Sequence, residues 1–64
     1  MNFNVRADLT SGFNIFRATM NFVPRIGEEI EAAGYIYKVK NVRYVFTVGT
    51  YASIPVQLLL EKVK

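Results

Sequence analysis

Arginines, lysines and tyrosines alternate along parts of this sequence, a pattern typical of surfaces that bind phosphate groups. An arginine guanidinium donates two parallel hydrogen bonds to one phosphate, and a tyrosine ring stacks on a base. Arg6 and Arg17 lie in neighbouring segments and share a face if those segments pair as strands. One hypothesis is therefore a binder of nucleic acid or of a nucleotide, including a protein that sequesters a signalling nucleotide. Its candidate residues are Arg6, Arg17, Lys38, Lys40, Arg43 and Tyr44.

The same residues have a plain structural explanation, in which the tyrosines pack in the core and the lysines are solvated. A net charge of +3 is modest for a protein that binds nucleic acid. Three glutamates between positions 28 and 31 reduce the basic character nearby. Both explanations stay open on the sequence, and a steep loss of binding with rising salt would favour nucleic acid.

Apolar side chains also occur on both faces of the predicted strands, in excess of what a small closed barrel needs. An exposed apolar patch of this kind marks a contact surface. We therefore predict, as the leading function, a non-catalytic, self-associating module that binds a protein, such as a phage or mobile-element accessory protein acting on a host factor. The alternative is that these residues fill a second small core under a loop. The candidate interface residues are Phe13, Ile15, Leu59 and Val63.

Catalytic chemistry finds little support. The sequence has no cysteine, histidine or tryptophan, which excludes disulfides, zinc sites built from cysteine or histidine, and catalysis by either residue. Glu29 and Glu31 share one face of a short predicted strand and could hold a metal, but a solvated edge strand explains them better. No glycine-rich phosphate loop and no nucleophile motif is present. We predict no enzyme activity, no cofactor and no metal site.

The length of 64 residues predicts one domain, 1–64, of low intrinsic stability. Apolar burial contributes roughly 95 kcal/mol for a chain of this size, and ordering the chain costs about as much. Self-association would supply the missing stability, so we expect a homo-oligomer, most simply a dimer. A structural assembly subunit is a further alternative, which predicts large oligomers without a ligand.

The longest uninterrupted apolar run, 58–60, is far shorter than the ~20 residues that cross a bilayer. The first residues do not form a charged region followed by an apolar run. We therefore expect a cytoplasmic protein with no membrane partner. A host protein, nucleic acid or a nucleotide are its possible partners.

These candidates must be positioned by short strands, because apolar and polar residues alternate with a period of two through most of the chain. Apolar residues on both sides of the second run at its start indicate either a bulge there or an end that another part of the molecule covers. Ala33 and Gly34 suit a tight hairpin, and a loop is expected over 49–53. The predicted strands are 2–8, 13–23, 28–32, 35–48 and 54–63.

The alternation changes phase inside the fourth run, which predicts a bulge or sharp bend near Lys40 and Asn41. A bent strand lets a small sheet curl into a barrel. Pro55 near the start of the last run favours an edge strand. The rival interpretation makes 54–63 a short helix with Ser53 as its N-cap, which would give an α+β fold.

The residues from Val23 to Ile30 and from Gly34 to Val42 resemble a pattern in many short bacterial and bacteriophage proteins of unassigned function. The pattern is a proline, a hydrophobic–Gly–acid turn, and then Gly-x-x-Tyr-x-Val-x-x-Val. Such proteins are expected to form small five-stranded SH3-like barrels, so the resemblance implies an all-β barrel of this type. It covers about a third of the chain and carries no active site.

Overall fold

The computed structural model describes residues 2–46 and 53–63, and these residues form five β-strands. Within these ranges there is no helix, and hence none long and apolar enough to span a membrane. The strand predicted over 54–63 is confirmed, and the helix alternative is wrong. The strands are β1 (Phe3–Leu9), β2 (Asn14–Met20), β3 (Glu29–Ala32), β4 (Tyr35–Tyr44) and β5 (Ile54–Lys62).

Two strands end three or more residues earlier than the alternation predicts, and β5 ends one residue early, at Lys62. β2 ends at Met20 rather than at 23, just before the bend that leads to Pro24. β4 ends at Tyr44, and the last two residues of its predicted run, together with most of the loop expected over 49–53, lie outside the described residues.

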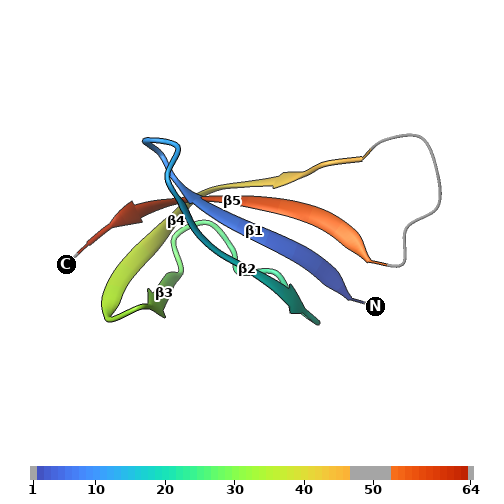
Figure 1. Ribbon diagram of the computed structural model, residues 1–64, viewed down its shortest axis with the longest axis horizontal. Coiled ribbons are helices and arrows are strands. Elements are labelled where there is room, and N and C mark those ends of the chain that lie inside the picture. Colours follow the sequence, from blue (N-terminus) through green and yellow to red (C-terminus); the bar gives the residue numbers. More distant parts are fainter. Residues whose placement is uncertain (1, 47–52, 64) are drawn as a thin grey trace.

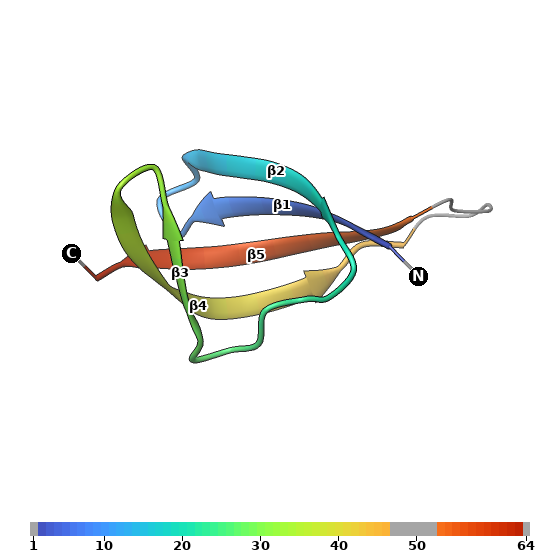
Figure 2. The same ribbon diagram turned by 90° about the horizontal axis from the view of Figure 1, so that it is seen from below.

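The strands form one sheet in the order β2-β1-β5-β4-β3. Neighbouring strands are antiparallel except β1 and β5, which run parallel. The sheet curls so that its edge strands β2 and β3 lie below the arch of β1 and β5 in Figure 1, and β3 runs antiparallel beside the first part of β4, across the direction of β1, β2 and β5 (Figure 2). The prediction of a small, five-stranded, SH3-like all-β barrel is thus confirmed, in the form of a half-barrel.

The core lies on the inner, concave face of this sheet. Cross-strand pairs place the alternating apolar residues of neighbouring strands side by side, as Val5 with Val56 and Ala7 with Leu58 show. Removing these side chains from water is the main source of stability in such a fold. The buried apolar residues are Val5, Ala7, Tyr37, Val39, Val56, Leu58 and Leu60.

A β-bulge in β4 keeps the core continuous. The register between β4 and β5 shifts between Val39 and Asn41, where the change of phase predicts a bulge. Val39 is buried before the shift, and Val42 after it pairs with Leu58 and packs against the core. The extra residue turns the second apolar set back to the concave face, and the strand bends around it.

A second bulge lies at the start of β2, as the apolar residues on both sides of that run suggest. Ala7 pairs with Phe16. The next pair is Asp8 with Asn14, which leaves Ile15 without a partner in β1. Ile15 packs against the core and stays partly exposed. The bulge returns Asn14 to the outer, convex face beside Asp8.

The hairpin between β3 and β4 turns through Ala33 and Gly34, as predicted. Both residues have positive φ, 53° and 83°, and the flanking Ala32 and Tyr35 pair directly. Positive φ at both central residues defines the tight turn that matches the twist of a hairpin. Glycine adopts this backbone freely, whereas alanine does so with steric strain.

The edge position predicted from Pro55 is wrong, because β5 is the central strand of the sheet. The proline is tolerated because it lies where β4 ends. Val45 N–H donates to the Pro55 carbonyl at 3.0 Å, and only the return bond of that pair is missing. On the side of β1, the N–H of the neighbouring Ile54 donates to the Asn2 carbonyl, so hydrogen bonding between β5 and the chain at β1 is kept beside the proline.

Candidate anion-binding site

Three arginines from three strands form a row across the convex face. Arg6 of β1 pairs directly with Arg17 of β2, and Gln57 of β5 pairs with both Arg6 and Arg43. The order across the sheet is therefore Arg17, Arg6, Gln57, Arg43, with adjacent strands about 4.8 Å apart. We call these four residues the arginine row. The predicted common face of Arg6 and Arg17 is confirmed.

The arginine row borders a hollow of about 410 Å³, which we call the arginine hollow. Its size falls within the roughly 300–1,000 Å³ of small-molecule sites. The next row along the strands supplies its other side, about 6.6 Å away by the rise of two strand residues. Its lining residues are Asn4, Arg6, Arg17, Arg43, Val45, Pro55, Val56 and Gln57.

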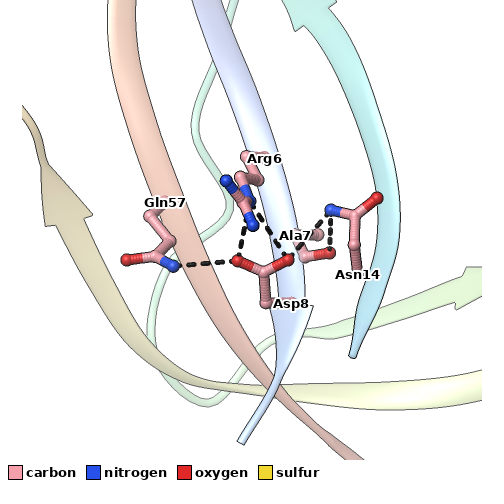
Figure 3. Close-up of polar contacts among 5 residues, drawn as sticks. All are labelled: Arg6, Ala7, Asp8, Asn14 and Gln57. Carbon is pink, nitrogen blue, oxygen red and sulfur yellow. Dashed lines mark hydrogen bonds and ion pairs between the residues drawn. The ribbon is translucent and has the colours of Figure 1, made fainter. Parts of the chain in front are cut away.

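Asp8 lies two residues from Arg6 on the same face of β1 and holds the row in place. Its side chain is only 4% exposed. Three neighbours hold the carboxylate: Gln57 Nε2 donates to Oδ2 at 2.8 Å, and Asn14 Nδ2 donates to Oδ1 at 2.9 Å. Arg6 Nε lies 3.0 Å from Oδ2 (Figure 3). The contacts join β1, β2 and β5 through one buried anion.

The contact between Nε and Asp8 sets the orientation of the Arg6 guanidinium. Because Nε faces Asp8, the two terminal nitrogens of the guanidinium take no part in that ion pair. The Arg6 side chain is 50% exposed, so its outer edge is accessible from solvent. A guanidinium held in this way is preoriented for a bidentate bond to a phosphate.

These contacts lower the pKa of Asp8 below its ordinary value of 3.8. The donor from Gln57 is the largest cause and the donor from Asn14 follows, and together with Arg6 they outweigh the opposing effect of burial. Hydrogen bonds to the ionised form favour it. Asp8 is therefore an anion at neutral pH and a fixed point for the row.

The described residues of the protein balance only part of the charge of the row. Asp8 offsets one of the three arginines, and in the described part of the chain neither Arg17 nor Arg43 forms an ion pair. Like charges directly opposite each other in a sheet are destabilising. The pairing of Arg6 with Arg17 therefore lowers stability unless an external anion lies between them.

The remaining predicted phosphate-binding residues lie elsewhere. Lys38 pairs with Glu61 and Glu29, about 13 Å along β5 from the row by strand rise. Lys40 lies at the bulge of β4, and neither lysine lines the hollow. Tyr44 is on the concave side, where its ring meets Phe3 edge-on at 6.5 Å between centroids. The arginines thus come together without the lysines and the tyrosine.

The predicted interface residues all lie toward the end of the sheet where β1 and β5 finish. Leu59 pairs with Asp8 on the convex face and is half-buried. Phe13 is 69% exposed after the β1–β2 turn, and Val63 is 45% exposed just beyond β5. Ile15 packs against the core as described above. Two of the four residues are therefore accessible to a partner.

Sequence reasoning missed the residues that organise the hollow. Asp8 is not among the predicted site residues, and its side chain is buried. The spacing of Arg6 and Asp8, two apart on one strand face, was a usable signal. The partnership with Gln57 was not, because it depends on parallel pairing between the first and last strands.

Glu29 and Glu31 lie exposed on the edge strand β3. In the described ranges no three acidic, histidine or cysteine side chains gather as metal ligands would. Comparison of this chain with protein-family models, with curated proteins and with solved structures found no match.

Proposed function

We propose that this protein is a non-catalytic binding module that takes a phosphate-bearing ligand on the convex face of its sheet. The observation that carries the proposal is the direct pairing of Arg6 with Arg17 beside Arg43, over a hollow where Asp8 is the one carboxylate in the described part of the chain that pairs with the row. This is the nucleic-acid or nucleotide hypothesis, restricted to three of its six residues.

The physical support is a sum of three effects. Arg6 and Arg17 are close enough, at one strand spacing, to share one phosphate. Asp8 holds Arg6 in place through Nε, so little side-chain freedom is lost on binding. An anion between the arginines also removes their mutual repulsion. Each effect favours the bound state.

The test is a titration with inorganic pyrophosphate, followed by amide chemical shifts and by calorimetry. Arg6→Gln or Arg17→Gln should weaken binding about tenfold or more, as expected for a charge-assisted hydrogen bond. Arg25→Gln is the matched control, since it removes the same charge from an exposed connection outside the hollow. Equal weakening by Arg25→Gln would show that only net charge matters and would refute the site.

A second candidate function is contact with another protein, either a second copy of this chain or another cytoplasmic protein. It is favoured by the exposure of Phe13 and Val63 at one end of the sheet. Native mass spectrometry should then show a dimer that tolerates salt and that Phe13→Asp and Val63→Asp dissociate. Val45→Asp, with a comparably exposed valine at the other end, should leave it intact.

A further inference from the structure

The arginine hollow has two chemically distinct sides. One side is the charged row described above. The other consists of the Asn4 amide, which is exposed, and the apolar surfaces of Val45 and Pro55. Val45 is 42% exposed, so its side chain is available for contact. A bare phosphate would use only the charged side.

The distance between the two sides suits one small molecule. The rows that contain Arg6 and Asn4 are two residues apart on β1, about 6.6 Å by strand rise, and Pro55 lies one strand across from Asn4, so Arg6 and Pro55 are roughly 8 Å apart. A single nucleoside unit bridges such a distance between its phosphate and its ring. The apolar surface can take the face of a ring, and the Asn4 amide can both donate to and accept from a ring edge.

Longer nucleic acid fits this surface less well. Proteins that bind single strands combine a basic groove with aromatic rings on which successive bases stack. Among residues 2–46 and 53–63 no aromatic one lines the hollow, and Tyr44 faces the opposite side of the sheet. The glutamates that pair with Lys38 flank the path beyond the row on the convex face. A strand leaving the hollow in that direction would meet carboxylates.

We propose that the arginine hollow binds a single phosphorylated ligand of nucleotide size, with its phosphates along the arginine row and its ring against Val45 and Pro55. This inference rests on the proposed function, because it assigns a ligand class to the same site. Asn4 selects among rings by hydrogen bonding. Arg43, at the other end of the row, receives further negative charge on the ligand.

The test compares ADP, GDP, CDP and UDP with inorganic pyrophosphate by calorimetry, because each nucleotide differs from pyrophosphate only by its nucleoside. At least one nucleotide should bind with one-to-one stoichiometry and about tenfold or more tighter than pyrophosphate, since burying a ring face adds apolar contact to the ionic bonds. Val45→Ser should remove most of this gain and leave pyrophosphate binding unchanged. Val63→Ser, at a valine of similar exposure away from the hollow, should change neither affinity.

The outcomes separate the two proposals. If pyrophosphate binds and no nucleotide binds more tightly, the ligand class is wrong while the anion site stands. If a thymidine dodecamer binds more tightly than every nucleotide and covers several nucleotides per protein, the site serves a polymer and the inference fails. If neither pyrophosphate nor any nucleotide binds, both proposals fail.

Discussion

The seven residues of β1 form two faces, and these faces contribute to the free energy of folding with opposite sign. On the concave face Val5 and Ala7 are fully buried and pack against β5. On the convex face Arg6 is half exposed and lies opposite another arginine, while Asp8 is buried as an anion. The concave face buries apolar side chains, as folding favours, whereas the convex face holds charged groups.

This difference assigns stability to the concave face and the proposed binding to the convex face. Apolar pairs on the concave face each lower the free energy of the folded state. The row of arginines raises it, because like charges face each other across one strand spacing. Structural features that cost stability and are kept in a marginally stable fold point to function. The predictions below test this division, from the largest expected effect to the smallest.

Truncation of Leu58 should have the largest effect, because its side chain is fully buried at the centre of the sheet. Leu58→Ala should lower the free energy of unfolding by about 3 kcal/mol, as for other buried leucines. Urea unfolding followed by circular dichroism measures it. Leu59→Ala, one residue on and only half-buried on the other face, should cost clearly less. Equal costs would break the comparison between the faces.

Replacement of Asp8 should come next, since it removes the acceptor for Gln57, Asn14 and Arg6. Asp8→Ala should lower the free energy of unfolding by about 2 kcal/mol at neutral pH, the cost of unpaired polar groups. It should also weaken pyrophosphate binding, because Arg6 loses its anchor. Unchanged binding would show that Asp8 has a structural role alone.

The same residue predicts a pH dependence with a definite sign. The pKa of Asp8 is lowered in the folded state, so its contribution is complete above the ordinary value of 3.8. The contribution is lost as the pH falls through the lower folded-state value. Urea midpoints between about pH 6 and pH 2 should show a steeper acid loss in wild-type protein than in Asp8→Asn. Parallel curves would contradict the assignment.

Replacement of Ala33 should stabilise the fold without affecting either face. Ala33 has a φ of 53° in the β3–β4 turn, a strained conformation for alanine. Ala33→Gly should raise the free energy of unfolding by about 1 kcal/mol, because glycine adopts this backbone without a Cβ clash. Pyrophosphate affinity should stay at the wild-type value, which makes this variant a control for stability effects on binding.

The smallest effect tests the cost of the arginine row directly. Arg17→Gln should raise the free energy of unfolding by about 0.5 kcal/mol at low ionic strength, because it relieves repulsion from Arg6. The gain should vanish in high salt, where the charges are screened. Arg25→Gln should leave stability unchanged. A loss of stability in Arg17→Gln would mean that the row is structural.

Much of the fold was predictable because the signals are local. Alternation predicted all five strands, with a helix as the alternative for the last, and the change of phase in the fourth run located the bulge in β4. The bulge in β2 was one of two explanations for apolar residues on both faces of that run. The error at Pro55 has a physical reason, since the missing donor costs only the return bond to Val45, which lies just beyond the end of β4 at Tyr44. Sequence alone does not show where a partner strand stops. For the same reason, sequence alone does not show which residues of other strands join the site.

The sequence by itself determined which side chains share a face within each strand, because side chains in a strand alternate with a period of two whatever the strand's neighbours. The spacing of Arg6 and Asp8, two residues apart, therefore determined that they share one face of the first strand. Only the tertiary structure decided that Gln57, 49 residues away from Asp8, joins them. That contact requires the parallel register of β1 and β5, which is set by the packing of Val5, Val56 and Leu58 on the opposite face. The core thus fixes the register, and the register assembles the arginine row.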